Sequence, residues 1–400
     1  MIIGIAAPYL LSDRKHGMDV ALVETLRVLA TLPSAHSYVV FARPGPDRAA
    51  MPQAPHLRLV TVSAPTALAW SQIALPRAAR RAGCGLLHTT GLATPLHAGM
   101  PTLLTLHDAA GLDRRRTDRV PLAPVARLRR TALRAFTRAI ASGARRVVTV
   151  SEFERARIAQ VIPELATRLR VIPNAVAPHF LEAPDAATLA RVRAERALPT
   201  RFVLGMGNSD ARQTLDGLLA AWHRLEQRGT ARPPLVLLAV TREMLDGALQ
   251  RIGAPASLAD GVHLVGFVPQ RELAAIHRMA SLFVYPTRTP SSGLPVLEAM
   301  ASGVPVITSR TAAMPELAGD AALCVDAGDP DAIADAIARG LTDETLRTAL
   351  RYAGPIRARS FSWHRVAKSW LRLHASVAAE VAHAEQSEPV VAPVTARASF

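Results

Sequence analysis

Residues that form covalent or metal-bound cross-links are scarce in this chain. Cysteine occurs only twice in 400 residues, as Cys84 and Cys324, which stand far apart. No CxxC, HExxH or closely spaced histidine pair accompanies them, so neither a disulfide framework nor a metal cage is indicated. We therefore expect two reduced thiols, no bound metal, no cofactor and a cytoplasmic location.

Aromatic residues and lysines are also few. Aromatic residues make up 4% of the chain, and no basic run is interleaved with rings on which single-stranded nucleic acids could stack. The chain carries a formal charge of +15, yet its only lysines are Lys15 and Lys368. Such an arginine-rich composition is weak support for an anionic partner, and we expect no nucleic-acid ligand.

Long apolar runs are absent as well. None approaches the roughly 18 residues of a membrane-spanning helix, so we expect a soluble or surface-bound protein. Half of the residues are apolar, which is enough for a large core, and a length of 400 residues favours two domains.

The chain does contain a repeated alternation of short apolar runs with longer segments of helical period. These runs are continuously apolar, which is typical of strands covered on both faces of a parallel α/β sheet. They fall into two series, which predict two Rossmann-like domains. The first series lies at residues 2–7, 37–42, 57–62, 85–90, 101–106 and 145–151, and the second at 201–207, 234–240, 262–267, 282–286, 304–309 and 321–326.

Prolines and loop-forming residues between the two series indicate a hinge near residues 173–195. The segment FSWHRVAKSWLRLHASVAAEVA has the period of one last amphipathic helix, with Trp363 and Trp370 as packing anchors. The expected units are a first domain at 1–178, a second domain at 179–360, a helix at 361–382 that packs back towards the first domain, and a disordered tail at 383–400.

The segment VYPTRTPSSGLPVLEAMASGVPVITS, residues 284–309, has the pattern of a diphosphate-binding loop and helix. Pro295 suits the first position of the helix, and Gly303 would end it. Unpaired N–H groups and the positive end of the helix dipole would point together at a ligand. Glu298 could accept hydrogen bonds from a ribose diol or merely offset the dipole, and the local pattern leaves both readings open.

The stretch from Val262 to Asp331, which contains this segment, resembles the family 4 glycosyltransferases, which are retaining enzymes of the GT-B fold that use nucleotide sugars. The resemblance extends to about residue 380 and includes TLHD at 105–108, VVTVSEFERARI at 147–158, VIPNAV at 171–176 and GMGNSDARQTLDGLLAAW at 205–222. It implies two Rossmann-like domains that face a central cleft, with the acceptor on the first domain and the nucleotide-sugar donor on the second.

The resemblance also implies roles for individual residues. His107 and Glu298 would be catalytic, His107 beside the transferred sugar and Glu298 on the nucleotide ribose. Phe267 and Val268 would border the nucleobase, and Gly17 would let an N-terminal loop approach the phosphates. The other implied donor-binding residues are Gly207, Asn208, Arg212, Gln213, Pro290, Ser291, Ser292, Gly293 and Leu294, with Gly293 and Leu294 presenting backbone N–H groups.

Two positions depart from the family pattern. Pro290 stands where the family has the first of two glutamates, and proline offers neither a carboxylate nor an N–H group. Gln213 stands where a diphosphate-binding lysine is expected, which leaves Arg212 and Arg288 as candidate replacements. Three readings stay open: the sugar is held by other groups, the loop is rebuilt, or donor turnover has been lost.

Residues 114–146 contain eleven arginines and one acidic residue. At helical spacing, one face carries Arg127, Arg130, Arg134 and Arg138, and the opposite face carries Leu128, Ala132, Phe136 and Ala139. Such a helix suits anionic lipid headgroups, although a solvated helix face would look the same.

The string Asp329-Pro330-Asp331 spells a DxD motif, but it precedes a helix and is interpreted as a helix cap. Our leading interpretation is a retaining, metal-independent hexosyltransferase that acts on a saccharide or lipid-linked glycan in bacterial surface polysaccharide assembly, with GDP-mannose as the first donor to test. It would work in the cytoplasm, on the inner face of the membrane. The alternative is a GT-B homologue without turnover that binds a glycan or supports a partner.

Overall fold

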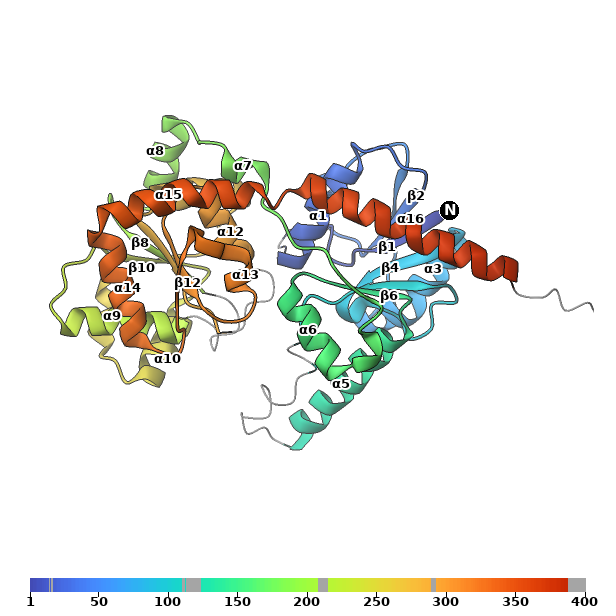
Figure 1. The fold of residues 1–400 in the computed structure, drawn as a ribbon, viewed down its shortest axis with the longest axis horizontal. Coiled ribbons are helices and arrows are strands. Elements are labelled where there is room, and N and C mark those ends of the chain that lie inside the picture. Colours follow the sequence, from blue (N-terminus) through green and yellow to red (C-terminus); the bar gives the residue numbers. More distant parts are fainter. Residues whose placement is uncertain are drawn as a thin grey trace, which may run out of the picture.

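The chain forms two α/β domains, each built around one parallel β-sheet (Figure 1). The computed structural model describes residues 1–13, 15, 17–109, 112, 124–207, 215–288 and 293–387. Within these residues the first sheet has seven strands in the order β3-β2-β1-β4-β5-β6-β7, and the second has six in the order β10-β9-β8-β11-β12-β13. The predicted α/β fold class with two Rossmann-like sheets is confirmed.

Six of the strands in the first sheet coincide with predicted apolar runs. The prediction misses β7, because its three residues run directly into the loop residues Pro173 and Asn174. The strands are β1 (Ile2–Ala6), β2 (Ser37–Ala42), β3 (Leu57–Thr61), β4 (Cys84–Thr90), β5 (Thr102–Thr105), β6 (Arg146–Thr149) and β7 (Leu169–Val171). The helices are α1 (Gly17–Leu29), α2 (Ala67–Ala69), α3 (Leu75–Arg81), α5 (Pro124–Gly143) and α6 (Glu152–Val161), and the shorter turns are η1 (Arg48–Ala50), η2 (Trp70–Ala74), η3 (Gly91–Ala93) and η4 (Pro163–Leu165).

All six strands of the second sheet lie in predicted runs. They are β8 (Val203–Met206), β9 (Leu235–Leu238), β10 (Val262–Val265), β11 (Leu282–Tyr285), β12 (Val306–Ser309) and β13 (Leu323–Val325). The helices are α7 (Pro178–Leu181), α8 (Ala186–Glu195), α9 (Leu215–Gln227), α10 (Arg242–Ile252), α11 (Gln270–Met279), α12 (Leu294–Ala301), α13 (Met314–Ala318), α14 (Pro330–Thr342) and α15 (Glu344–Arg359), with the turns η5 (Ala256–Gly261) and η6 (Gly319–Ala321).

Burial on both faces explains why the strands are continuously apolar. All four residues of β9 are buried. Val236 and Leu238 belong to one hydrophobic cluster, and Leu235 and Leu237 belong to another on the opposite face of the sheet. Side chains of a strand alternate between faces, so a strand with helices on both sides needs an apolar residue at every position.

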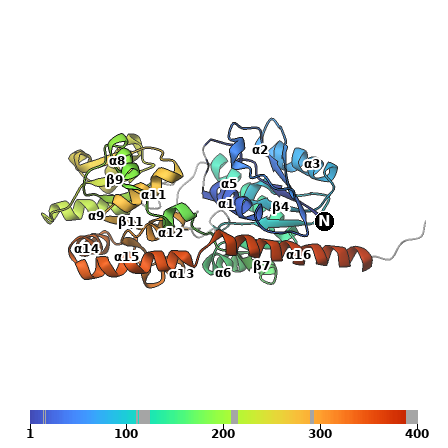
Figure 2. The same ribbon diagram turned by 90° about the horizontal axis from the view of Figure 1, so that it is seen from above.

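The last helix, α16 (Trp363–Ser387), crosses from the second domain to the first. Figures 1 and 2 show α15 along the second domain and α16 along the first. Trp363 and Trp370 are buried in the hydrophobic cluster that joins α16 to α1 and β1, as predicted for packing anchors. The helix runs five residues beyond the predicted end at 382, because the sequence there continues with good helix formers. Residues 388–400 lie outside the described part of the chain.

The order of the strands indicates where each sheet would bind a ligand. In each sheet the chain starts in the middle and then builds outward in both directions, so connections leave on opposite sides at β1 and β4 and at β8 and β11. In open α/β sheets, ligands bind beyond the carboxyl ends of the strands at such points. The domain limits given above stay a prediction.

Candidate active site

The two domains meet at the first turns of two helices. Helix α1 follows β1, and α12 follows β11, so both begin at the carboxyl edge of their own sheet. A Cβ atom built on Gly17 would lie 3.6 Å from Leu294 Cδ1. The structure therefore brings together Gly17 of the first domain and Leu294 of the second, two positions that the sequence assigns to the donor phosphates.

A second contact joins the two domains. Glu316 of α13 accepts hydrogen bonds from the backbone N–H groups of Glu152 (3.0 Å) and Phe153 (3.2 Å). These groups lie in the first turn of α6, where N–H groups have no partner inside the helix and the dipole favours an anion. A carboxylate of one domain thus caps a helix of the other. Sequence reasoning did not identify Glu316, because the capped helix lies more than 150 residues away.

Helix α12 begins within one residue of the predicted position. Gly293 precedes the helix with φ of 59°, a conformation that favours glycine. A Cβ atom there would lie 2.4 Å from Met314 Cε, so packing also requires glycine. The helix begins at Leu294, which makes Pro295 its second residue rather than its first, and Gly303 follows its end with φ of 73°. Backbone N–H groups at Gly293 and Leu294 can therefore point at a diphosphate.

Glu298 lies in the interior of this helix with 6% of its surface exposed. Burial raises the pKa of its carboxyl to about 8, and a hydrogen bond from the Gln270 side chain opposes this rise. Burial, together with the Glu298 charge, raises the pKa of Tyr285 to about 12. A buried carboxyl with so little compensation is suited to accept hydrogen bonds from a ligand hydroxyl pair. The assignment of Glu298 to the ribose stays a prediction.

The loop after β10 carries the two residues predicted to border the nucleobase. Phe267 is 60% exposed, which is unusual for a large aromatic side chain, while Val268 is partly buried against the core of the second domain. An exposed ring on a loop that is anchored by its neighbour offers a flat apolar surface for a base.

The glycines after β8 have a packing explanation. A Cβ atom at Gly205 would lie 2.6 Å from Leu218 Cδ2, and one at Gly207 would lie 2.4 Å from Val240 Cγ2. Neither position tolerates a side chain without displacement of its neighbour. Packing is therefore sufficient to explain both glycines. The donor-binding role of Gly207 stays a prediction.

Several predicted donor-binding residues lie outside the described part of the chain. They are Asn208, Arg212, Gln213, Pro290, Ser291 and Ser292. Arg288 is described, and it lies just beyond the carboxyl end of β11 with its Nε 3.4 Å from the carbonyl oxygen of Ala327. Arg288 is thus at the correct edge of the sheet to bind phosphate, and this role stays a prediction.

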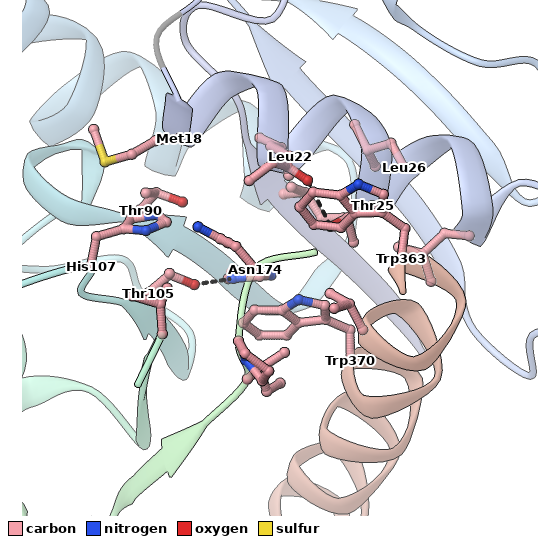
Figure 3. A pocket seen from close by; sticks show the side chains of 18 of the residues that line it. Met18, Leu22, Thr25, Leu26, Thr90, Thr105, His107, Asn174, Trp363 and Trp370 are labelled. Atoms are coloured by element: carbon pink, nitrogen blue, oxygen red, sulfur yellow. Dashed lines mark hydrogen bonds between the residues drawn. The ribbon is translucent and has the colours of Figure 1, made fainter. Parts of the chain in front are cut away.

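On the acceptor side, His107 follows β5 and lines a cavity of about 50 Å³. Figure 3 shows its ring beside Thr90, Thr105 and Asn174, with Met18 of α1 near the ring. Burial lowers the pKa of His107 to about 4, against the opposing effect of the Asp108 charge. The imidazole is therefore neutral near pH 7 and can donate one hydrogen bond and accept another.

A chain of buried polar side chains supports the strand that ends at His107. Thr105 Oγ1 lies 2.9 Å from His88 Nε2, His88 Nδ1 lies 3.3 Å from His374 Nε2, and His374 Nδ1 lies 3.4 Å from the Tyr38 hydroxyl. Burial holds the pKa of His88 well below its usual range and lowers that of His374 to about 3. These side-chain contacts connect α16 to β4 and β5. It escaped prediction because its two histidines are 286 residues apart.

Glu154 holds the loop that follows His107. Its Oε2 accepts a hydrogen bond of 2.9 Å from the backbone N–H of Ala109, and its Oε1 lies 3.3 Å from Arg157 Nη1. Ser151 caps α6 by accepting from the backbone N–H of Glu154. In a capping box the glutamate would return to the N-cap residue. Here Glu154 instead accepts from Ala109, in the loop that follows His107, and so positions His107.

Comparisons with known proteins agree with this geometry. The profile described as "Glycosyltransferase Family 4" matches residues 16–180, and the profile described as "Glycosyl transferases group 1" matches residues 200–343. The chain belongs to the family 4 glycosyltransferases. The two profiles meet near the linker between the sheets, so each covers one of the two domains.

Similar proteins include two mannosyltransferases. The O-antigen chain mannosyltransferase B of Escherichia coli is 31% identical over 220 residues, which are 55% of this chain and 58% of that protein. The GDP-mannose-dependent alpha-(1-6)-phosphatidylinositol monomannoside mannosyltransferase of Mycolicibacterium smegmatis is 33% identical over 241 residues, which are 58% of this chain and 60% of that protein. The chain therefore spans about three-fifths of the length of these relatives.

A solved structure confirms the fold. The sucrose-phosphate synthase of Thermosynechococcus elongatus superposes with a TM-score of 0.73 at 22% sequence identity, over 95% of this chain and 99% of that chain. At this identity the likeness concerns the fold, which is the two-domain GT-B fold predicted from the sequence.

Asn174 is a further residue at the His107 cavity, and sequence reasoning treated it only as part of the linker. It follows β7, is 8% exposed and lines the same cavity as His107. Its amide nitrogen has no hydrogen-bond partner among the residues that the structure describes. A buried amide without a partner is costly, which makes it a candidate donor to a bound substrate. Its presence in the VIPNAV motif was the signal in the sequence.

The interpretation of the DxD string as a helix cap is confirmed. Asp329 is the N-cap of α14, and its Oδ1 accepts from the backbone N–H groups of Asp331 (2.9 Å) and Ala332 (3.1 Å). Asp331 itself pairs with Arg228 at 2.6 Å. In the described ranges, no group of three or more histidine, cysteine, aspartate or glutamate side chains could hold a metal ion.

Helix α5 has two faces, as predicted, but the distribution of exposure corrects the predicted pattern. Phe136 lies on the packed side with Ile140 and Ala141. Arg130 and Arg134 are half-buried and have partners, and Arg138 pairs with Glu164 at 3.0 Å. A row of exposed apolar residues at helical spacing consists of Val125, Leu128, Ala132, Ala135 and Ala139. Packing of the wider side against α6 and its neighbours leaves this apolar row in solvent.

Proposed function

We propose that this protein is a retaining glycosyltransferase that moves a hexose from a nucleoside-diphosphate sugar to a saccharide acceptor. One observation carries the proposal: Gly17 of the first domain lies against the first turn of α12, the helix that carries the buried carboxyl of Glu298, and Met18 next to it lines the cavity of His107. A helix N-terminus for a diphosphate, a carboxyl for a ribose and a neutral histidine for the sugar then share one cleft.

The residues of the second domain would hold the donor. Backbone N–H groups at Gly293 and Leu294 would bind the diphosphate, and Arg288 would add a fixed cation at the same edge of the sheet. Glu298 would accept from the ribose, and Phe267 would cover the base. These groups and the α12 dipole supply the stabilisation of the leaving diphosphate that the proposal needs, so it includes no metal ion.

The residues of the first domain would position the acceptor. In the proposed step the acceptor oxygen bonds to C1 of the sugar while the bond from C1 to the diphosphate oxygen breaks, on the same face of the sugar. The acceptor proton passes to that phosphate oxygen. Neutral His107 would hold the transferred sugar by hydrogen bonding, with Glu154 fixing the loop that carries it.

The proposed donor is GDP-mannose, and the transferred sugar is mannose. Both relatives described above are mannosyltransferases by name, and one is named as GDP-mannose-dependent. Their names also mention an O-antigen chain and phosphatidylinositol monomannoside, which supports a lipid-linked or surface glycan as acceptor and a role in bacterial surface polysaccharide assembly.

Helix α5 supports a peripheral site of action at the inner face of the membrane. Its exposed row includes Val125 at 78% and Leu128 at 72% exposure, and the exposed arginines Arg127 and Arg129 flank the row. Apolar side chains between arginines match the boundary between acyl chains and anionic headgroups. Among the described residues no helix has the length and apolar character to cross a bilayer, so binding would take place at the surface.

The first experiment is calorimetric titration of GDP-mannose, UDP-glucose, dTDP-glucose and ADP-glucose with chelator present. We expect one donor to bind and Glu298→Gln to weaken it by about tenfold, since glutamine cannot take the ionised form that two ribose hydroxyl donors would favour in Glu298. Glu243→Gln, a change at an exposed glutamate of α10, is the matched control. Absence of binding by all four donors would contradict the proposal.

The alternative function is a GT-B homologue without turnover. Pro290 and Gln213 favour it, because each replaces a charged residue of the family pattern. Donor binding that depends on Glu298, without release of the nucleoside diphosphate over a panel of glycan acceptors, would select this alternative.

A further inference from the structure

A second cavity opens on the carboxyl edge of the first sheet, outside the site described above. Its volume is about 320 Å³, within the range of small-molecule sites. Met18, Leu22 and Thr90 line both this cavity and the one at His107, so the two adjoin. We call it the Arg43 pocket, after the only cation among its described lining residues. Its other walls come from the end of β1, the start of α1, α2, η2 and η3.

The walls of the Arg43 pocket are mostly apolar. Trp70 is buried, and its indole N–H donates to the carbonyl oxygen of Val62, which leaves only its apolar ring for the pocket. At the mouth, Tyr9, Met18 and Leu92 are each about half exposed, and neighbouring Leu68 is 64% exposed. Large apolar side chains gathered in solvent around a cavity indicate a binding surface.

The segments that carry these side chains are held in place. The side-chain amide of Gln72 in η2 donates to the carbonyl oxygen of Thr94 at 3.1 Å and accepts from the backbone N–H of Leu96 at 2.9 Å. Thr94 and Leu96 follow η3, so one glutamine fastens η2 to the segment after η3. These hydrogen bonds therefore fix the segments that form the mouth of the pocket.

Arg43 adds a positive charge to this apolar cavity. It follows β2, and its guanidinium makes no hydrogen bond or ion pair with any described residue, whereas nearby Lys15 is paired with Asp47. A planar guanidinium binds phosphate oxygens bidentately. Asp19 also lines the pocket, in the first turn of α1. Its carboxylate suits sugar hydroxyls rather than an anion.

The strand order gives the distance between this charge and the transfer site. His107 follows β5 and Arg43 follows β2, and the sheet runs β2-β1-β4-β5 between them. Three intervals of about 4.8 Å place the two strand ends about 14 Å apart. A saccharide of one or two hexose units bridges such a distance, with its accepting hydroxyl at His107.

We propose that the Arg43 pocket binds the phosphate and the first isoprenoid units of a lipid-phosphate-linked acceptor, whose short saccharide lies along the sheet edge to His107. The phosphate pairs with Arg43, the apolar chain lies on Trp70 and leaves past Leu92 and Leu68, and the sugar meets Asp19. The direction of the saccharide rests on the function proposed above, while the pocket itself does not.

The test is calorimetric titration of farnesyl phosphate, farnesol and inorganic phosphate into the full chain. We expect farnesyl phosphate to bind, Arg43→Gln to weaken it about tenfold, and Arg48→Gln, an exposed neighbour, to leave it unchanged. Farnesol should bind more weakly and equally to all three proteins. Equal affinity of Arg43→Gln and wild type for farnesyl phosphate, or binding of inorganic phosphate as tightly, would overturn the proposal.

Two further variants locate the site. Ala67→Trp fills the pocket from an exposed position and should abolish farnesyl phosphate binding, while Leu128→Ser on α5 should leave it intact. The opposite result would place the binding on α5. Circular dichroism and the melting temperature show that each variant is folded.

GDP-mannose titration separates the two proposals. Ala67→Trp and Arg43→Gln should bind the donor as wild type does, because the pocket lies on the other domain. Intact donor binding with no effect of Arg43→Gln on farnesyl phosphate would refute the pocket alone. Farnesyl phosphate binding that depends on Arg43, in a chain that binds no donor, would refute the glycosyltransferase and leave a lipid-phosphate site.

Discussion

Replacement of Glu298 by glutamine should stabilise the protein at alkaline pH while it weakens donor binding. The carboxyl of Glu298 has a pKa of about 8 in the folded chain, against 4.5 for an ordinary glutamate. As pH rises between these values, the unfolded chain loses a proton that the folded chain keeps. The free energy of unfolding therefore falls with pH, and the penalty is complete only above pH 8. Glutamine has no such titration.

The magnitude follows from the two pKa values. At about 1.4 kcal/mol for each pKa unit, the penalty on wild type is on the order of 1 kcal/mol at pH 5.5 and on the order of 4 kcal/mol at pH 8.5. The stability advantage of Glu298→Gln should thus grow by about 3 kcal/mol between these pH values. Other titrating groups affect both proteins equally and cancel from the difference.

Urea unfolding followed by circular dichroism at pH 5.5 and pH 8.5 measures this advantage. Glu243→Gln on α10 is the control and should show no growth with pH. An advantage of Glu298→Gln that is the same at both pH values would refute the reasoning, since it would mean that Glu298 titrates normally in the folded chain.

Three other changes test other parts of the structure. His277 is fully buried, both of its ring nitrogens are unpartnered in the described structure, and burial lowers its pKa to about 3, so it must stay neutral when folded. The stability change caused by His277→Phe should therefore be more favourable by about 2 kcal/mol at pH 5 than at pH 8 in thermal unfolding. The same change at both pH values would contradict this. Glu316→Ala removes the cap on α6 and should open the cleft, seen as a larger radius of gyration in X-ray scattering, with Glu243→Ala unchanged. Leu128→Ser should reduce sedimentation with anionic vesicles about tenfold, and equal recovery of wild type in the supernatant with anionic and with neutral vesicles would exclude the membrane site.

The sequence was sufficient to predict the sheets and helix α12, because their signals are local. Continuous apolar runs predict strands buried on both faces, and the glycine and proline around Glu298 predict the limits of α12 to within one residue. Strand β7 was missed, because three residues beside a proline carry too little pattern to be distinguished from a loop.

The parts of the site that escaped prediction depend on contacts between distant segments. Neither His88 nor His374 has a local motif, and they meet only because α16 returns to the first sheet. The α5 pattern likewise predicts two faces but not which one is packed. That depends on the segments, distant in sequence, against which Ile140 and Ala141 pack. The Arg43 pocket is visible only once β2 and β4 are placed on either side of β1.

The two domain connections lie side by side, and this determines how the cleft can move. Val176 of the first connection forms a bridge with Ser362 of the second, and its N–H donates to the carbonyl oxygen of Phe361 at 3.2 Å. A rotation of one domain against the other must pass through this paired point, so contacts near it change little. Asn174, two residues before the bridge, therefore stays at the His107 cavity, whereas the Glu316 cap on α6 breaks when the cleft opens. Closure would then assemble the donor site against an acceptor site that is already formed within the first domain.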